Sequence, residues 1–315
     1  MSKLNILLIG LGSMGSIHKR IIEHTENVNL YGVVDSKFEK KFEKKNGINY
    51  FKTINSIDFA SENIDGAIIA SSTDTHFKFA DLLFNENIPI LVEKPIVTKP
   101  DELDFLVKNA IKHNKIFRSG LIEIYNPIFN YIKDLNLNDI ISIQIFRHSQ
   151  PISGKRKLEN VLYDLALHDI SVINYIFSNP KINLLGHSSL PKNGKIESSE
   201  LLLNFNDTSL FISSSRESQI KIREWNIQTR SKLFKIDLIA QKIDIYEAGS
   251  IKSLDANIFN TKSNHTTVSF ANKPETAQIQ FDYFIKNIYE NKVDKDHLNL
   301  AKKSHNLVSD ILKNK

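Results

Sequence analysis

The chain has 315 residues, of which 41% are hydrophobic and 24% charged, and its formal net charge is +5. This length exceeds one ordinary core and indicates two domains, while the composition is that of a soluble globular protein. Because the sequence contains no cysteine, disulfides, thiolate nucleophiles and cysteine-ligated zinc are excluded.

The charge and the N-terminal pattern exclude two classes of partner. No apolar run approaches the roughly 20 residues that a membrane helix needs, and residues 1–6 lack a signal-peptide pattern, so we expect a cytoplasmic protein without membrane partners. The densest basic stretch, Lys37–Lys45, carries Glu39 and Glu43 at helical spacing. Such interleaving favours a solvated, ion-paired helix face over a nucleic-acid site.

Short apolar runs alternate with amphipathic stretches in the N-terminal part of the chain. Strands are predicted at 4–9, 30–34, 66–70, 88–92 and 116–119, and helices at 16–24, 77–85 and 101–113. Strands that are apolar on both faces and are joined by helices are typical of a parallel, doubly wound sheet. We therefore expect an α/β fold that begins with a Rossmann domain over residues 1–119.

After Gly120 the strands alternate apolar and polar residues. They are predicted at 140–146, 200–205, 210–214, 222–229, 235–239 and 243–246, with helices at 161–177, 275–289 and 297–312. Successive alternating strands with short connections indicate an antiparallel sheet. Residues 120–315 are expected to form an α+β substrate-binding domain with a large, mostly antiparallel open sheet.

A glycine motif lies between the first strand and the first helix. Its predicted cofactor contacts are Gly10, Gly12, Ser13, Met14 and Gly15. The first glycine permits a tight turn, the second admits a pyrophosphate and the third lets the helix pack on the strand. Asp35 ends the next strand, where a carboxylate accepts hydrogen bonds from the ribose hydroxyls and repels a 2′-phosphate. The pattern predicts NAD as cofactor, with NADP as the alternative.

Two further segments follow predicted buried strands. The first supplies the cofactor candidates Ser71, Ser72, Thr73 and His76. Ligands of open α/β sheets bind at the carboxyl ends of the strands, although Asp74 or Thr75 could simply cap the next helix. The second segment is Glu93-Lys94-Pro95, in which Glu93 is a cofactor candidate. Lys94 is placed to contact the cofactor and the substrate and to exchange a proton.

Asp164 and His168 are four residues apart in a predicted helix and therefore face the same side. An Asp–His pair on one face can bind a sugar hydroxyl and move its proton. A plain exposed polar stripe is the alternative interpretation. No third ligand stands at convincing spacing, so we expect no metal.

In this order, the glycine motif, Asp35, Glu93-Lys94-Pro95 and Asp164-Leu165-Ala166-Leu167-His168-Asp169 resemble the Gfo/Idh/MocA family of dehydrogenases. The resemblance covers nearly the whole chain. It implies a Rossmann domain followed by a domain whose outer sheet face joins subunits, so we expect a homo-oligomer, either a dimer or a tetramer. It also implies oxidation of a sugar or cyclitol hydroxyl with NAD or NADP, and catalytic roles for Lys94, His168 and Asp164.

Three stretches, 120–127, 162–169 and 221–224, look most like the UDP-N-acetylglucosamine 3-dehydrogenases. Leu121 and Ile124 replace the histidine and the arginine of that pattern. The implied substrate contacts are Lys94, Glu123, Tyr125, Asn126, Asp164 and His168. Arg147 and Lys155 could contact a diphosphate, but solvated surface is the favoured interpretation of both.

The function expected from these residues is NAD-dependent oxidation of the 3-hydroxyl of UDP-N-acetylglucosamine. Lys94 or His168 would accept the hydroxyl proton, and Asp164 would orient the sugar or the histidine. One alternative is a dehydrogenase of another substrate, such as a UDP-sugar uronate, a free sugar or an inositol. The other is a non-catalytic regulator that binds NAD, which the intact Lys94, Asp164 and His168 disfavour.

Overall fold

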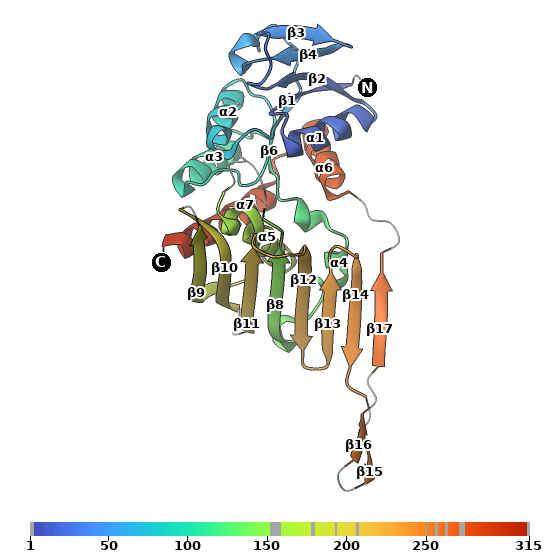
Figure 1. The fold of residues 1–315 in the computed structure, drawn as a ribbon. Coiled ribbons are helices and arrows are strands. Elements are labelled where there is room, and N and C mark those ends of the chain that lie inside the picture. Colours follow the sequence, from blue (N-terminus) through green and yellow to red (C-terminus); the bar gives the residue numbers. More distant parts are fainter. Residues whose placement is uncertain are drawn as a thin grey trace. The chain divides into compact units, whose positions relative to one another are not determined.

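The computed structural model describes residues 3–151, 159–177, 180–192, 194–205, 208–249, 251–255, 258–261, 264–270 and 275–313 (Figure 1). It divides into two compact units. The first consists of Met1–Tyr125 and Glu275–Ser309, and the second of Asn126–Pro274 and Asp310–Lys315. Across the described ranges, no helix is long and apolar enough to cross a membrane.

The first unit is built on a sheet of order β3-β4-β2-β1-β5-β6-β7. Its strands are β1 (Leu4–Ile9), β2 (Val28–Val34), β3 (Phe42–Lys45), β4 (Ile48–Phe51), β5 (Gly66–Ile69), β6 (Ile90–Val92) and β7 (Phe117–Ser119). All neighbours are parallel except β3 and β4. The parallel strands follow the order 3-2-1-4-5-6 of dinucleotide-binding folds, which confirms the predicted Rossmann sheet.

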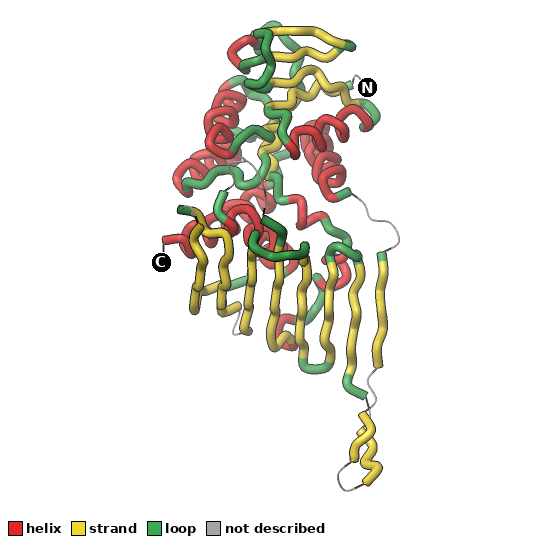
Figure 2. Tube along the Cα trace, viewed as in Figure 1, coloured by secondary structure: helices red, strands yellow, loops and turns green. Residues whose placement is uncertain are grey.

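Helices cover both faces of this sheet. They are α1 (Ser13–His24), α2 (Thr73–Asn85), α3 (Pro100–Lys112), α6 (Thr276–Glu290) and α7 (Lys295–Lys313), with 3₁₀ turns at Ile54–Ser56 and Ile122–Tyr125. Helices α1 and α6 lie together on one face, and α2 and α3 lie together on the other (Figures 1 and 2).

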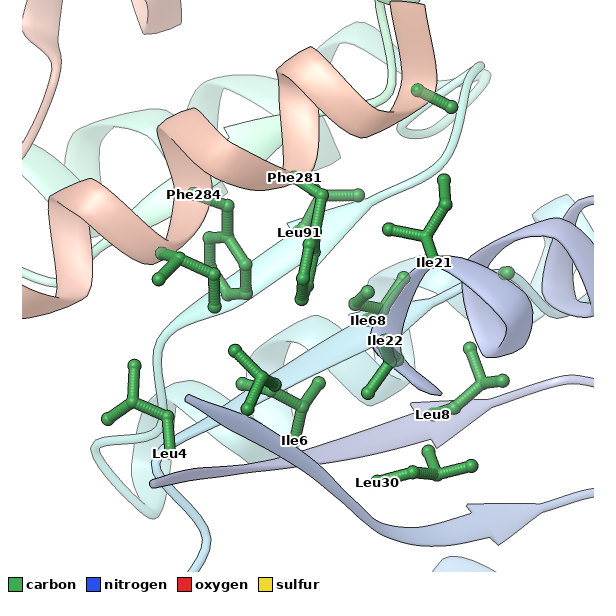
Figure 3. Packing of buried hydrophobic residues seen from close by; sticks show 14 of the residues in the cluster. Leu4, Ile6, Leu8, Ile21, Ile22, Leu30, Ile68, Leu91, Phe281 and Phe284 are labelled. Carbon is green, nitrogen blue, oxygen red and sulfur yellow. The ribbon is translucent and has the colours of Figure 1, made fainter. Parts of the chain in front are cut away.

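Helix α6 completes the core of the first unit, although it follows the second unit in the chain. Phe281 and Phe284 are fully buried in a cluster that includes Ile6 and Leu91 (Figure 3). At Gly66 an added Cβ would lie 2.9 Å from the side chain of Ile288, so strand β5 and α6 are in close contact. Burying each phenylalanine contributes roughly 1.5–3 kcal/mol, which explains why α6 belongs to this unit.

The helical spacing predicted for Lys37–Lys45 is wrong. Residues 42–45 form β3, which pairs antiparallel with β4. The turn between them is Asn46-Gly47, with φ of 52° and 81°, and an Asn-Gly pair with positive φ is a strong hairpin signal that the charge pattern masked. The solvated character is confirmed, because β3 is exposed and Lys40 pairs with Glu43 at 2.9 Å.

The second unit contains a sheet of order β17-β14-β13-β12-β8-β11-β10-β9. Its strands are β8 (Ile140–His148), β9 (Ile182–Lys192), β10 (Lys195–Phe205), β11 (Thr208–Ser215), β12 (Ile222–Thr229), β13 (Lys232–Asp237), β14 (Lys242–Glu247) and β17 (Asn264–Ser269), while β15 (Ile251–Asp255) and β16 (Ile258–Thr261) pair separately. All neighbours in the larger sheet are antiparallel except β8 and β11. The predicted mostly antiparallel sheet is confirmed.

Helices cover one face of this sheet. They are α4 (Ile128–Ile132), a π-helix (Leu162–Ala166) that continues into α5 (Leu167–Ile176), and a 3₁₀ turn at Leu137–Asp139. The rings of Phe129 in α4 and Trp225 in β12 lie 5.1 Å apart, which joins the helical layer to the sheet. A helix over residues 161–177 was predicted correctly, but not its π turn.

Candidate active site

The glycine motif forms the turn between β1 and α1. Gly10 has φ of 93°, and a Cβ there would lie 2.5 Å from the backbone nitrogen of Ser71. A Cβ at Gly15 would overlap the carbonyl oxygen of Gly10. At Gly12, by contrast, an added Cβ would meet nothing within 4 Å. Packing therefore requires glycine at 10 and 15, whereas open space lies beside Gly12.

The start of α1 fits the pyrophosphate of a dinucleotide. Gly12 is the N-cap residue and provides no side chain to cap the helix. Gly12 and Ser13 are exposed, while Met14 is half-buried and packs against the core. The N–H groups of a first helical turn have no intrahelical acceptor, and together with the helix dipole they favour a bound anion.

Asp35 follows β2 and is held beside the glycine loop. Its carboxylate accepts hydrogen bonds from the backbone N–H groups of Leu11 at 2.7 Å and Lys37 at 2.9 Å. Asp35 is half-buried. This position suits a partner for ribose hydroxyls.

The segment after β5 forms the start of α2. Ser72 is the exposed N-cap residue and Thr73 begins the helix, while the hydroxyls of Ser71 and Thr75 lie 2.7 Å apart. His76 is buried, with Nε2 3.1 Å from the carbonyl oxygen of Ser71 and Nδ1 3.0 Å from that of Pro95. These contacts give His76 a structural role, and its contact with a cofactor stays a prediction.

Glu93 and Lys94 follow β6. Glu93 is 5% exposed, and its Oε1 lies 2.7 Å from Nε2 of the fully buried His18 in α1. Its Oε2 accepts a hydrogen bond from the backbone N–H of Lys94 at 3.2 Å. Lys94 is half-buried, and the Lys94–Pro95 peptide is cis. The sequence interpretation missed His18, whose signal is its place three residues after Gly15, on the buried side of α1.

The predicted substrate contacts near residue 125 fall in both units. Glu123 and Tyr125 lie in the first unit and Asn126 in the second. Glu123 is half-buried. The Tyr125 hydroxyl accepts hydrogen bonds from Nη2 of Arg118 at 2.7 Å and from its Nε at 3.1 Å. Asn126 is buried and its Oδ1 accepts the N–H of Ile128 at 3.2 Å. Tyr125 and Asn126 therefore have structural contacts of their own.

In the second unit, Asp164 lies in the π-helix and His168 in α5, and both are half-buried. Asp164 accepts a hydrogen bond at 3.0 Å from Nη1 of Arg216, a residue 1% exposed that follows β11. The Nε of Arg216 donates to Glu197 at 2.6 Å. A buried guanidinium thus holds Asp164, an arrangement that sequence spacing could not reveal.

The interpretation of Arg147 as solvated surface is wrong. Arg147 is 3% exposed, and its guanidinium donates to the fully buried Asp169 at 2.5 and 2.8 Å. The indole of Trp225 donates to the same carboxylate at 3.0 Å. Arg147 is buried because its side chain lies on the inward face of β8, together with those of Ile143 and Ile145. Lys155 lies outside the described residues.

The first unit collects the predicted cofactor residues at one edge of its sheet. The glycine motif, Asp35, Ser71–His76 and Lys94 follow β1, β2, β5 and β6, and these strands are parallel. Ligands of open α/β sheets bind at such an edge. Within the part of the chain that the structure describes, no group of three or more potential ligands is placed to hold a metal.

Several proteins of similar sequence or fold are named as dehydrogenases or reductases. UDP-N-acetylglucosamine 3-dehydrogenase of Acidithiobacillus ferrooxidans is 21% identical over 245 residues, 77% of each chain. Myo-inositol 2-dehydrogenase of Thermotoga maritima is 22% identical over 231 residues, 68% of this chain and 69% of the relative.

Two solved structures share the fold over nearly the whole chain. That of the Acidithiobacillus enzyme, GnnA, has a TM-score of 0.77 at 16% identity and covers 98% of this chain and 96% of its own. KijD10, a 3-ketoreductase from Actinomadura kijaniata solved with TDP-benzene and NADP, has a TM-score of 0.80 at 10% identity, with the same coverage of 98% and 96%.

The family model described as an oxidoreductase family with an NAD-binding Rossmann fold matches residues 4–121. This range contains the glycine motif, Asp35 and Glu93-Lys94-Pro95, whereas the Asp164–Asp169 motif lies outside it. Residues 4–121 thus match the model of the Gfo/Idh/MocA oxidoreductase family.

Proposed function

We propose that the protein oxidises a secondary hydroxyl of a sugar to a ketone with NAD, and that its best substrate is the 3-hydroxyl of UDP-N-acetylglucosamine. The observation that carries this proposal is the common sheet edge that holds the glycine motif, Asp35 and Lys94 in a domain of an oxidoreductase family. The similarity to a UDP-N-acetylglucosamine 3-dehydrogenase supports the choice of substrate.

In this proposal each group of residues has a separate role. The first turn of α1 and Gly12 bind the pyrophosphate, Asp35 binds the adenosine ribose, and Ser71–Thr73 line the remainder of the cofactor. When bound, NAD would supply the acceptor for the hydride that leaves the carbinol carbon. Lys94 or His168 accepts the hydroxyl proton, so that the alcohol loses one hydride and one proton and becomes a ketone. Asp164, held by Arg216, orients the sugar or His168.

NAD is proposed over NADP because of Asp35. Its carboxylate is fixed at the glycine loop by two backbone N–H groups, where a 2′-phosphate would meet negative charge. The exposed Lys37 is the residue nearby that could offset this repulsion. A similar fold binds NADP in KijD10, so the cofactor has to be measured.

The direct test mixes purified protein with NAD and UDP-N-acetylglucosamine and follows the absorbance of NADH. A panel of a UDP-sugar uronate, free glucose and myo-inositol is run in parallel, and each mixture is repeated with NADP. We expect the highest kcat/KM with the first pair. Tight binding of NAD without hydride transfer from any of these substrates would instead support a non-catalytic regulator.

Inositol is the second candidate substrate, because several relatives of similar identity are inositol dehydrogenases. An inositol lacks the charged diphosphate of a nucleotide sugar, so the KM for inositol should depend less on ionic strength than the KM for the nucleotide sugar, whose binding should weaken with added salt. The salt dependence of KM therefore separates the two candidates.

A further inference from the structure

Side chains from three helices hold the backbone that carries Lys94. The segment between β6 and α3 leaves the sheet, so its polar backbone groups need other partners. The N–H of Ile96 donates to Nε2 of His305 in α7 at 3.1 Å. The carbonyl oxygens of Pro95 and Ile96 lie 3.0 and 3.2 Å from Nδ1 of His76 in α2. Both polar groups of the Pro95–Ile96 peptide are thereby tied to helices.

The third anchor is the pair of His18 and Glu93. His18 is fully buried in α1, Glu93 is 5% exposed, and their polar atoms lie 2.7 Å apart. The second carboxylate oxygen accepts the N–H of Lys94. Gly120 packs against the same backbone, because a Cβ there would lie 2.7 Å from the backbone nitrogen of Lys94. The backbone at Lys94 is therefore held by packing as well as by hydrogen bonds.

His305 is suited to act as a permanent acceptor. Its Nδ1 donates to the carbonyl oxygen of Ala301 at 2.8 Å, which leaves the Nε2 lone pair for Ile96. Burial lowers the pKa of His305 to about 4, so the ring stays neutral at neutral pH. A neutral imidazole in this tautomer accepts the same hydrogen bond throughout the range in which a dehydrogenase works.

We propose that His18, His76 and His305 are positioning residues that hold the backbone at 93–96 and so fix the place of the Lys94 amine. This inference rests on the proposed function, in which Lys94 exchanges a proton with the substrate hydroxyl. Proton transfer needs the two heavy atoms within hydrogen-bond reach, and a displacement of about 1 Å can cost on the order of 100-fold in rate. In this role the three histidines act through the backbone and not on the substrate.

The chain contains a matched control in the same helix. His297 is 6% exposed and its Nε2 accepts the backbone N–H of Ser119 at 3.0 Å, much as His305 accepts that of Ile96. Burial also lowers the pKa of His297, to about 3. Its partner lies in β7 rather than in the segment that carries Lys94. Loss of either ring acceptor should therefore destabilise the fold similarly.

The experiment compares His305→Phe with His297→Phe, since phenylalanine keeps a ring and removes the acceptor. We expect similar losses of Tm, but only His305→Phe should speed hydrogen–deuterium exchange in a peptide covering 93–98. His305→Phe should lower kcat by roughly 10- to 100-fold while the Kd for NAD changes little. His305→Gln should recover most of kcat, because its amide oxygen can accept the Ile96 N–H.

A double-mutant cycle with Lys94→Ala tests whether His305 acts through Lys94. His305→Phe should cause no further loss in the Lys94→Ala background. An equal loss in both backgrounds, or equal losses of kcat in the two phenylalanine variants, would overturn the positioning role. Unchanged exchange at 93–98 would overturn it even without a known substrate. If the wild-type protein is inactive on every substrate, the proposed function is contradicted. The exchange measurement would then still test whether His305 holds the backbone at 93–96.

Discussion

Arg216 donates a hydrogen bond to Asp164 at 3.0 Å and another to Glu197 at 2.6 Å, so one buried guanidinium holds two carboxylates. Arg216 is 1% exposed on its side chain, while Asp164 and Glu197 are 24% and 20% exposed. A charged group with so little contact with water needs these partners. Asp164 is therefore a fixed carboxylate rather than a mobile surface charge.

Replacement of Arg216 by Gln should destabilise the protein and lower turnover. Removal of one partner from a buried ion pair costs about 3–5 kcal/mol, and we expect the lower end because both carboxylates are partly exposed to water. Denaturant unfolding measures the stability and NADH formation the turnover. Arg147→Gln is the control, because it breaks the comparable pair with Asp169 without touching Asp164. If Arg147→Gln lowers kcat as much as Arg216→Gln does for the same loss of unfolding free energy, a role for Arg216 at the site is contradicted.

Asp35→Asn should change the choice of cofactor. The amide can still accept the N–H of Leu11, but it removes the charge that binds ribose hydroxyls. Hydrogen bonds to charged groups contribute about 1.5–3 kcal/mol, so the Kd for NAD should rise roughly 10- to 100-fold. The Kd for NADP should rise less or fall, because the repulsion of its 2′-phosphate is gone. Fluorescence titrations give both constants, and an equal loss for NAD and NADP would mean that Asp35 serves only the fold.

His305 and His297 should make the protein sensitive to acid. Burial lowers the pKa of His305 to about 4 and that of His297 to about 3, from an ordinary 6.5. Between pH 6.5 and the lowered pKa of each histidine, the unfolded chain binds a proton at that residue and the folded chain does not. The stability that is present above pH 6.5 is therefore lost as pH falls through this range. Each group should contribute a loss of about 1.4 kcal/mol per pH unit within its window.

The measurement compares the free energy of unfolding of wild type and His305→Gln at several pH values. The variant should be less stable than wild type at neutral pH, and the difference should shrink as pH falls from 6.5 toward about 4. Because the carboxylates titrate in both proteins, they cancel in this difference. Parallel curves for the two proteins would show that His305 is not buried in its neutral form.

Helix α6 should be required for the stability of the first unit. Phe284→Ala removes a fully buried ring and should cost about 3–5 kcal/mol. Tyr289→Ala on the same helix is the control, since Tyr289 is 45% exposed and its loss should stay within about 0.5 kcal/mol. Denaturant unfolding of both variants checks the prediction. Similar small effects would mean that α6 is not part of this core.

Local patterns predicted most strands of both sheets, because burial on both faces or on one face leaves a direct mark on the sequence, but the edge strands β9 and β17 were not predicted. The Asn46-Gly47 hairpin was missed because charged residues of β3 happened to match helical spacing. Partners across the fold were also missed. His18 meets Glu93 over 75 residues, Arg216 meets Asp164 over 52, and His305 meets Ile96 over 209. Periodicity shows that a side chain points inward but not which side chain it meets.

The candidate site was predictable where one motif follows one strand. Gly10–Gly15, Asp35 and Lys94 could be placed from the sequence because each directly follows a parallel strand of the same sheet. The roles of Lys94, His168 and Asp164 stay predictions, since they depend on a substrate whose position no local pattern determines. The surroundings of Arg147 were misjudged because a single charge at an inward register position looks like any surface arginine.

The most direct test of the account is the rate of NADH formation with saturating NAD and UDP-N-acetylglucosamine in Lys94→Ala, His168→Ala and the double variant. If both residues handle the same hydroxyl proton, each single change should lower kcat by about 10²–10⁴, while the Kd for NAD stays near that of wild type. The kcat of the double variant should then be little lower than that of the slower single variant. Wild-type rates in both single variants, or losses that match a loss of NAD binding, would contradict the proposed dehydrogenase.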